Sequence, residues 1–381
     1  MIYMDKTVCQ LNACTGCMAC VNICSQNAIF VSEGIETYNA EINPEKCIGC
    51  GMCKRVCPNI KPCKTTYPIY CKQGWTNDEK IRKNSSSGGV ASSLIKSFIE
   101  SGGYVASCLF KNGEFKFEIT NDINVARKFA GSKYVKSNPG NVYKEIKSLI
   151  RQDKRVLFIG LPCQSAAVQN ICGNENLYTV DLICHGTPSP YLLKKYLDEK
   201  GYDWNKITDI QFRDKANWGL LKNGIGITPS GVMDCYLRAF LYSIDYTENC
   251  YHCRYASGNR VSDITLGDAW GLMADEVSEG VSLILCQNQK GINLIESANL
   301  HLEEADINRA IEGNPQLKQP ANKHHRRDKF LRAISKQKTF RWATFISFPK
   351  DSVKQSINAS LIKLKLKKEN VKGGYRLTLY Y

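Results

Sequence analysis

Hydrophobic positions in the middle of the chain predict strands that alternate with helices. Tyr104–Phe110 and Phe115–Thr120 read as two strands around Asn112-Gly113, a pair typical of a two-residue hairpin turn. The apolar runs Arg155–Ile159 and Leu177–Ile183 each lead into a polar loop and then a helix. Two such repeats of strand, polar loop and helix predict parallel β/α units that bind ligands at the carboxyl ends of their strands.

Further apolar patterns extend this arrangement on both sides. Helical spacing occurs at Val90–Ile99, Tyr143–Ile150, Pro190–Glu199 and Ile292–Leu300. Shorter strands are expected at Ala28–Val31, Ile207–Phe212, Gly224–Thr228, Ile264–Leu266 and Val281–Gln287. These elements predict an α/β fold (α+β overall), in which a small N-terminal module precedes a mixed α/β domain and a helical C-terminal tail.

The C-terminal part differs from the rest in its charge. From Lys318 to the end the chain holds seventeen basic and three acidic side chains, whereas the first 317 residues hold 34 basic and 33 acidic ones. A nearly neutral body disfavours a nucleic-acid-binding surface. Between Asp351 and Lys372, apolar residues recur at helical spacing among lysines, namely Val353, Ile357, Leu361 and Leu364. Such a helix suits an anionic membrane surface or an acidic partner, and packing of its apolar stripe on the body is the alternative.

Length and composition set the class of protein. With 381 residues the chain has room for two or three domains. No apolar run reaches the roughly eighteen residues that span a membrane, and the first ten residues lack the apolar core of a secretion signal. Nineteen cysteines without such a signal predict a reducing, cytoplasmic setting in which thiols serve as metal ligands.

Eleven of these cysteines lie between residues 9 and 71 and include two copies of the spacing C-x2-C-x2-C-x3-C. Bacterial ferredoxins hold two cubane 4Fe–4S clusters with this spacing, and the fourth cysteine of each run binds the other cluster. By this crossed rule one cluster is held by Cys14, Cys17, Cys20 and Cys57, and the other by Cys47, Cys50, Cys53 and Cys24. Gly16 and Gly49 let backbone amides approach the sulfurs.

Other uses of this cysteine pattern fit less well. A disulfide framework is typical of short secreted chains, and structural zinc uses two C-x2-C pairs in place of two runs of four. Ser25 follows the first run where proline is usual, so we expect looser packing there but no lost cluster. Cys9, Cys63 and Cys71 lie outside the spacing, and we assign them no ligand role.

A loop rich in serine and glycine precedes the helix predicted at Val90–Ile99. Its residues Asn84–Gly89 expose several backbone N–H groups to one anion, which suits the pyrophosphate of a dinucleotide such as FAD. An ordinary serine cap of the helix is the alternative. A second polar loop, Gly131–Asn138, offers a cation and an aromatic ring to a nucleotide.

Seven short phrases occur in an order that resembles the coenzyme F420 hydrogenase/dehydrogenase beta-subunit family. They are S-S-G-G-V at 86–90, G-S-K-Y-V at 131–135, G-L-P-C-Q at 160–164, D-L-I-C-H-G at 181–186, F-R-D-K at 212–215, C-x2-C at 250–253 and S-D-I-T-L-G-D-A-W-G at 262–271. The resemblance covers about residues 75 to 300, and an N-terminal ferredoxin fusion is also seen in this family. It implies a flavoprotein that binds FAD and iron–sulfur clusters and passes electrons between a two-electron donor or acceptor and one-electron centres.

The remaining cysteines support a third cluster. Cys163 and Cys184 each follow a predicted parallel strand and should lie on one edge of the sheet, while Cys250 and Cys253 form a close pair in a later loop. The resemblance suggests that these four hold a further 4Fe–4S cluster beside the flavin. Buried free thiols, a zinc site and a reactive Cys163 are the alternatives. Four cysteines in apolar or helical patterns are assigned to the core: Cys108, Cys172, Cys235 and Cys286.

For the flavin we expect contacts from the two polar loops. The phosphates are assigned to Ser86, Ser87, Gly88 and Gly89, with Ser132, Lys133 and Tyr134 nearby. Lys133 would stabilise an anionic reduced flavin, and His185 would donate a hydrogen bond or shuttle a proton, with a structural role as its alternative. An anionic substrate, or else an internal ion-pair network, would engage Arg213, Lys215, Arg260 and Asp263. Catalytic roles are predicted for His185, Lys133, Arg213 and Lys215.

The leading hypothesis is an FAD- and 4Fe–4S-dependent oxidoreductase. It would pass electrons between coenzyme F420, or a biosynthetic substrate such as one in polysaccharide synthesis, and one-electron carriers through FAD and the clusters. The expected partners are a ferredoxin or deazaflavin carrier and a small-molecule substrate, and a homo-oligomer is compatible with the sequence. A non-catalytic electron-relay subunit and a flavin-free redox sensor are the alternatives. The expected domains are residues 1–68 (ferredoxin-type), 75–315 (FAD and iron–sulfur) and 316–381 (basic tail).

Overall fold

The computed structural model describes residues 6–213, 218–229, 232–272 and 279–366. Its strands are β1 (Ile29–Glu33), β2 (Tyr38–Ile42), β3 (Tyr70–Thr76), β4 (Tyr104–Lys111), β5 (Glu114–Thr120), β6 (Val156–Gly160), β7 (Leu177–Leu182), β8 (Ile210–Arg213), β9 (Trp218–Lys222), β10 (Ile225–Gly226), β11 (Ile264–Asp268), β12 (Ser282–Cys286) and β13 (Leu300–Glu304). Its helices are α1 (Ala19–Ile23), α2 (Met52–Val56), α3 (Glu79–Lys83), α4 (Val90–Glu100), α5 (Ile123–Ala126), α6 (Val142–Arg151), α7 (Pro162–Cys172), α8 (Pro190–Glu199), α9 (Cys235–Leu241), α10 (Gln289–Glu296), α11 (Ile307–Gly313), α12 (Arg327–Ser335), α13 (Phe340–Ser347) and α14 (Pro349–Lys363).

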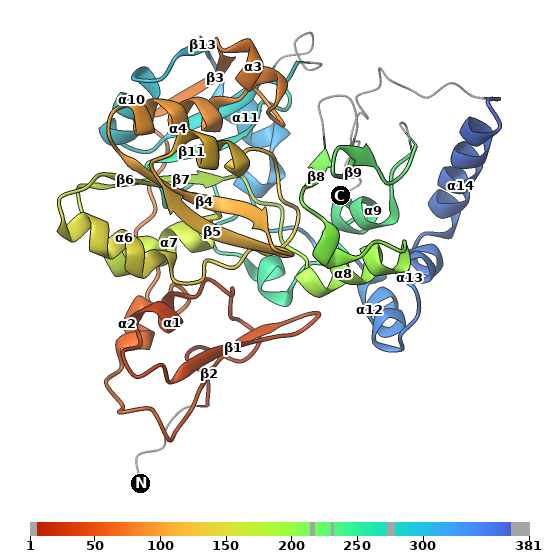
Figure 1. Cartoon of the computed structure of the whole chain (residues 1–381), viewed down its shortest axis with the longest axis horizontal. Coiled ribbons are helices and arrows are strands. Elements are labelled where there is room, and N and C mark those ends of the chain that lie inside the picture. Colours follow the sequence, from red (N-terminus) through yellow and green to blue (C-terminus); the bar gives the residue numbers. More distant parts are fainter. Residues whose placement is uncertain (1–5, 214–217, 230–231, 273–278, 367–381) are drawn as a thin grey trace.

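The chain folds into three parts that can be followed in Figure 1. The N-terminal module, with α1, α2 and the hairpin β1–β2, lies beneath a large sheet flanked by helices. A smaller lobe beside the sheet contains α8, α9, the strands β8 to β10 and the helices α12 to α14. The predicted mixed α/β fold with a ferredoxin-like N-terminal module is therefore confirmed.

The large sheet has eight strands in the order β13-β3-β12-β11-β7-β6-β4-β5. β4, β6, β7 and β11 are parallel neighbours, as the repeated strand–loop–helix pattern predicts. One face packs on α4 and α10 through residues such as Leu94 and Ile295, and the other on α6 and α7 through Ile146 and Val168. The parallel strands therefore end at one common edge, where the loops after β6, β7 and β11 emerge.

Local sequence signals account for several of these elements. β4 and β5 pair in antiparallel register around Asn112 (φ 54°) and Gly113 (φ 75°), the left-handed conformation that a two-residue hairpin turn needs. α8 spans Pro190–Glu199 as predicted, because the Ser189 hydroxyl caps it and proline fixes its first turn.

Two strands and one helix differ from the sequence-based expectation. β3 and β13 carry no clear alternation, but β3 pairs with β12 on one side and β13 on the other, so tertiary partners define it. The helix predicted at Ile292–Leu300 is wrong at both ends. It begins at Gln289 because the Asn288 side chain caps it, and it ends at Glu296 before Leu300 enters β13.

The predicted basic tail is in part a component of the smaller lobe. α12 and α13 contribute Phe330 and Phe340 to the same buried cluster as Leu193 of α8 and Tyr236 of α9. The boundary predicted at residue 316 is not tested by this packing and stays a prediction.

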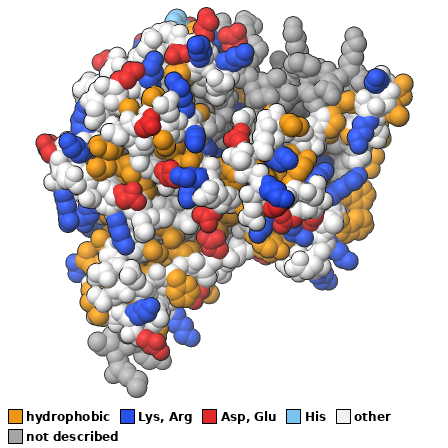
Figure 2. All heavy atoms as spheres, viewed as in Figure 1, with side chains coloured by type: hydrophobic (Ala, Val, Ile, Leu, Met, Phe, Trp, Pro, Cys, Tyr) orange, Lys and Arg blue, Asp and Glu red, His pale blue; other side chains and the backbone are white. Residues whose placement is uncertain are grey.

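α14 presents its apolar stripe to solvent. Val353, Ile357 and Leu364 are 47%, 54% and 67% exposed, while Ser352 is buried and Asp351 pairs with Arg238 of α9 at 3.3 Å. Packing of this stripe on the body is therefore wrong for these three residues. In Figure 2, hydrophobic and basic side chains gather together along the edge formed by α13 and α14. Contact of this edge with a membrane or an acidic partner stays a prediction; within the ranges given above, no helix has the length and apolarity to cross a bilayer.

Candidate iron–sulfur and flavin site

The cysteines of the N-terminal module gather as the crossed rule requires. Cys14, Cys17, Cys20 and Cys57 line one small pocket between α1 and the β1–β2 hairpin, so the last cysteine of the second run lies with the first three of the first run. The Gly16 amide donates to Cys14 Sγ at 3.4 Å, as expected for a glycine that brings the backbone close to a sulfur. Cys9, to which the sequence assigned no role, lines the same pocket. The ligand sets themselves stay a prediction.

The two sets of N-terminal thiols differ in their exposure. All four thiols of the first set, Cys14, Cys17, Cys20 and Cys57, are buried. In the second set, Cys24, Cys47 and Cys53 are partly buried and Cys50 is exposed. The second set therefore lies at the surface of the module, and the first lies between it and the rest of the protein.

The module docks on the sheet domain through α6 and α7. Asn22 donates to the Gly140 carbonyl at 2.6 Å, and Asn170 of α7 donates to the Lys61 carbonyl at 2.9 Å. Cys17 packs in the same hydrophobic cluster as Val168 of α7. This contact brings the first set of thiols against the edge where β6 ends.

A third set of thiols lies at that edge, formed by Cys163, Cys184, Cys250 and Cys253. Burial raises the pKa of Cys163 well above its usual value, and the nearby Cys253, Cys184 and Cys17 raise it further through charge repulsion. Burial also raises the pKa of Cys184 to about 12, with Cys250 and Cys253 as the neighbours that add to the shift. Four partly buried thiols near one another suit a cluster whose irons stabilise thiolates.

The donor set also bears on the alternative of a single zinc ion. In the part of the chain that the structure describes, no three His, Cys, Asp or Glu side chains converge as ligands of one metal ion. The thiols around a cubane bind four different irons and need not converge on one point. A third 4Fe–4S cluster at these four cysteines stays a proposal.

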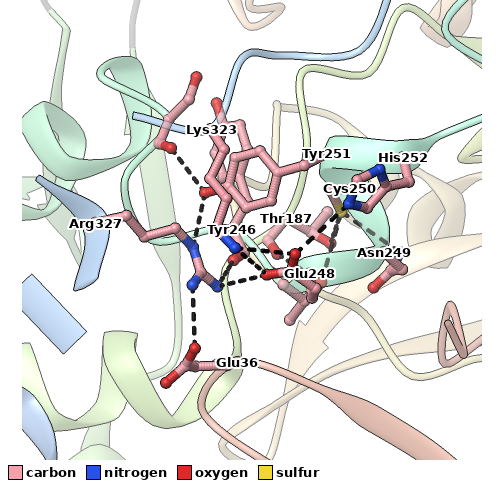
Figure 3. Close-up of polar contacts among 12 residues, drawn as sticks. Glu36, Thr187, Tyr246, Glu248, Asn249, Cys250, Tyr251, His252, Lys323 and Arg327 are labelled. Carbon is pink, nitrogen blue, oxygen red and sulfur yellow. Dashed lines mark hydrogen bonds and ion pairs between the residues drawn. The ribbon is translucent and has the colours of Figure 1, made fainter. Parts of the chain in front are cut away.

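Three side chains that the sequence did not single out surround Cys250, as Figure 3 shows for two of them. The hydroxyls of Thr187 and Thr247 lie 3.7 and 3.5 Å from Cys250 Sγ, and the Asn249 amide donates to it at 3.6 Å. Donors to a ligand sulfur stabilise its negative charge and raise the reduction potential of a cluster. Thr247 and Asn249 lie in the loop of Cys250 itself, whereas Thr187 comes from the loop after β7, so only folding brings it to Cys250.

Lys136 is a buried cation between the N-terminal module and the third set of thiols. Its side chain is 6% exposed, its Nζ donates to the Thr15 carbonyl at 3.1 Å, and it lies 4.9 Å from the ring centre of Tyr38. Its charge also lowers the pKa of Cys163 and Cys184 against the larger effect of burial. One ammonium group therefore acts on the first cluster loop and on the third set together.

Replacing Lys136 with methionine should lower the reduction potentials of the adjoining clusters by on the order of tens of millivolts, because a buried positive charge stabilises an added electron. Lys136→Arg keeps the charge and should keep most of the potential. Redox titration of the anaerobic protein followed by electron paramagnetic resonance measures both. Unchanged potentials in Lys136→Met, or equal shifts in the two variants, would contradict this role.

Arg327 ties the three parts of the molecule together (Figure 3). Its side chain is 1% exposed and pairs with Glu36 of the module's hairpin at 3.0 Å and with Glu248 at 3.7 Å. It also donates to the Tyr251 hydroxyl at 3.2 Å and to the Tyr246 carbonyl at 2.9 Å. Since Glu248 and Tyr251 flank Cys250, this arginine links the ferredoxin-type module to the loop that carries two of the third set's thiols.

The two loops assigned to the flavin meet at the N-terminus of α4. The Ser132 amide donates to the Ser86 hydroxyl at 3.0 Å, and Ser87 donates to the Val281 carbonyl at 2.9 Å. A side chain at Gly88 would come within 2.4 Å of the Gly74 carbonyl, so this glycine serves close packing of the loop on β3. Gly89 (φ 83°) is the residue before α4. An anion-binding helix start with two serines fits a dinucleotide phosphate, and these contacts stay a proposal.

The ammonium group of Lys133 binds backbone carbonyls of its own loop. Its Nζ donates to the carbonyls of Phe129, Ala130 and Gly131 at 2.6, 2.8 and 2.9 Å, and burial lowers its pKa. All three N–H donors of the ammonium group thus bind the backbone of its own loop. A direct role of Lys133 toward flavin stays a prediction that these contacts do not support.

His185 and Arg213 lie in one polar cluster with Asp268 and Tyr134. Arg213 pairs with Asp268 at 2.9 Å. The negative charge of Asp268 raises the pKa of His185, and the positive charge of Arg213 lowers it. Burial lowers the pKa of His185 to about 4, so the imidazole is neutral at pH 7 and can donate one hydrogen bond and accept another. The Tyr134 ring stacks on Phe240 at 4.4 Å beside this group.

Two of the other predicted polar residues, Arg260 and Asp263, have partners inside the fold. Arg260 pairs with the fully buried Asp181 at 2.7 Å, and Asp263 accepts from the Thr179 amide at 2.7 Å, so both belong to the internal network that was the alternative to substrate binding. Lys215 lies outside the described residues.

Two family models match parts of this chain. Residues 153–309 match the family model for the C terminus of the coenzyme F420 hydrogenase/dehydrogenase beta subunit, and residues 13–59 match a 4Fe–4S dicluster domain. The chain is 24% identical over 233 residues to a subunit of the F(420)H(2) dehydrogenase of Methanosarcina mazei, covering 57% of this chain and 66% of that protein. It is 23% identical over 256 residues to an uncharacterized protein of Methanocaldococcus jannaschii, covering 55% and 69%.

About a third of each of these relatives lies outside the match. A solved structure of the F420-reducing nickel–iron hydrogenase complex from Methanosarcina barkeri also matches, with 17% identity and a TM-score of 0.47, over 68% of this chain and 97% of that one. The resemblance seen in the sequence is confirmed by the two family models. Residues 153–309 are therefore similar to the C terminus of the coenzyme F420 hydrogenase/dehydrogenase beta subunit, and residues 13–59 match a 4Fe–4S dicluster domain.

Proposed function

We propose that this protein is an iron–sulfur flavoprotein oxidoreductase. It exchanges electrons between a two-electron reactant, coenzyme F420 or a biosynthetic substrate such as one in polysaccharide synthesis, and one-electron carriers. 4Fe–4S clusters supply one-electron transfer, and FAD converts between one- and two-electron chemistry. The N-terminal thiols would hold two clusters, the four thiols at the sheet edge a third, and the loops around Ser86 and Ser132 the flavin.

One observation carries this proposal: Cys17 packs in one hydrophobic cluster with Ala167 and Val168 of α7, the helix that has Cys163 in its first turn. This contact supports a short path between the buried N-terminal set and the third set. With the exposed set around Cys50 as the outer end, the three sets would form a series from the surface to the sheet edge. A series of this kind supports electron passage between a surface carrier and a reactant held at the sheet edge.

The residues at the sheet edge have distinct tasks in this proposal. Ser86 and Ser132 bind the flavin phosphates through the start of α4. Arg213, held by Asp268, places a fixed positive charge beside neutral His185, which orients a reactant by hydrogen bonding. Tyr134 and Phe240 close the apolar side of this group.

Anaerobic purification with iron, acid-labile sulfide and flavin measured per chain tests the proposal. We expect about twelve irons and one FAD, and then reduction of the protein by F420H2 or reduced ferredoxin. About eight irons with one FAD would remove the third cluster only. No flavin after reconstitution with FAD would overturn the flavoenzyme.

The second candidate is a non-catalytic relay that passes electrons to a separate catalytic chain. The name of the Methanosarcina mazei relative, which is one component of a dehydrogenase, favours this candidate. Turnover of F420H2 with a one-electron acceptor by the isolated chain would exclude it, whereas cluster reduction without turnover would support it.

A further inference from the structure

We propose that the surface around Cys50 is the docking site of an acidic one-electron carrier protein. This inference rests on the proposed function, because it assigns the second thiol set to a cluster that exchanges electrons with the outside. We call this surface the Cys50 rim; it consists of the exposed residues Lys46, Ile48, Cys50 and Arg55, which belong to the loop that carries Cys47 and Cys50 and to the helix α2 that follows it.

The Cys50 rim is the place where a cluster site reaches the surface. Cys50 is the exposed member of the two N-terminal sets, and added Cβ atoms at Gly49 and Gly51 would meet nothing within 4 Å. A partner can therefore approach the backbone of this loop without displacing side chains. Electron transfer slows steeply with distance, so the exposed set is the natural point of exchange.

The rim is also basic. Residues 44–56 hold three basic side chains and one acidic one, whereas residues 6–30 around the first run hold a single lysine and no acid. Among the described residues, Lys46 and Arg55 are exposed and make no ion pair. Unpaired positive charges around a redox site steer a negatively charged partner and raise its rate of association.

The apolar residue of the rim favours a protein partner. Ile48 is 67% exposed and lies between Lys46 and Cys50 in their loop. An apolar centre with a charged border is the usual anatomy of a protein–protein interface. Lipids and nucleic acids could bind the cations, but they carry no redox centre to serve the cluster. The observations thus favour a small acidic electron carrier over either of these polyanions.

A charge-reversal variant tests the rim with a matched control. Lys46→Glu/Arg55→Glu changes two exposed side chains of the rim, and Lys336→Glu/Lys338→Glu makes the same change of charge on the exposed end of α12, away from the module. The probe is a purified acidic bacterial ferredoxin, reduced and mixed with the oxidised holoprotein in a stopped-flow instrument at low ionic strength. The signal is bleaching of the N-terminal clusters, which does not require flavin or turnover.

We expect the rim variant to be reduced about ten- to a hundredfold more slowly than the parent protein, and the control variant at the parental rate. The difference should vanish in about 0.5 M salt, because added ions screen the attraction. Reduction by methyl viologen radical, a small cation, should not fall in either variant. Iron content should stay the same in all proteins, since the changed side chains bind no iron.

Ile48 is tested separately. Ile48→Ser should weaken ferredoxin binding with little change in its salt dependence, and Ile48→Leu should restore it. The inference is overturned if the rim variant keeps the parental rate, if the control variant slows equally, or if the rim variant loses only binding to phosphatidylserine vesicles. A protein without flavin would overturn the proposed function yet leave this cluster-bleaching result intact.

Discussion

Substitution of both Cys250 and Cys253 with alanine is expected to lower the iron content from about twelve to about eight atoms per chain. The two cysteines supply half of the thiols of the third set, and the remaining pair, Cys163 and Cys184, cannot enclose a cubane. The N-terminal clusters should survive, because their ligands lie within residues 14–57. Electrons from reduced ferredoxin should then reach the N-terminal clusters but reduce flavin at least a hundredfold more slowly.

Iron and sulfide analysis with electron paramagnetic resonance measures the first effect, and stopped-flow absorbance measures the second. Cys235→Ala is the matched control, since Cys235 is a partly buried cysteine at the start of α9 with Arg238 as its neighbour. It should keep about twelve irons. A double variant that keeps all its iron would show that the four thiols hold no cluster.

The second large effect is expected from Arg327→Met, which should lower the free energy of unfolding by about 2–3 kcal/mol. Methionine fills a similar volume but leaves Glu248, the Tyr251 hydroxyl and the Tyr246 carbonyl without their common donor. The estimate stays at the low end for a buried pair because Glu36 is 45% exposed and regains water. Anaerobic urea unfolding followed by circular dichroism measures the change.

Two further variants make this prediction specific. Arg332→Met lies on the exposed side of the same helix and should cost no more than about 0.5 kcal/mol. Glu36→Gln combined with Arg327→Met should destabilise less than the sum of the two single changes, because both remove the same ion pair. Additive effects would mean that the arginine stabilises the lobe alone and does not hold the module against it.

Local sequence patterns were sufficient for the parts of the fold that local physics controls. The spacing of Cys14 to Cys24 and of Cys47 to Cys57 identifies a dicluster module, since three thiols two residues apart can surround one face of a cluster. The runs before Cys163 and Cys184 predict parallel strands, and this prediction places both thiols on one sheet edge. The Asn112-Gly113 hairpin and the Ser189-Pro190 helix start follow from turn and cap preferences.

Other features required the tertiary structure because their partners are far apart in the chain. β13 exists through its pairing with β3, more than two hundred residues earlier, and its own sequence gives a weak signal. Lys133 looks like a cofactor ligand in sequence, yet its ammonium group is taken up by three carbonyls of its own loop. The apolar stripe of α14 looks like a packing surface, yet polar contacts by Ser352 and Asp351 turn it to solvent.

The sequence by itself was enough to identify the dicluster module, the parallel β/α units and the family resemblance, and to predict the cluster ligands of the module. Each of these depends on short spacings between neighbouring residues. The tertiary structure alone decided the contact of the N-terminal module with α7, the position of the buried cation Lys136 and the Arg327 link from Glu36 to Glu248. Charges and sulfurs act through space, and only folding sets the distances between residues that the sequence separates by more than a hundred positions.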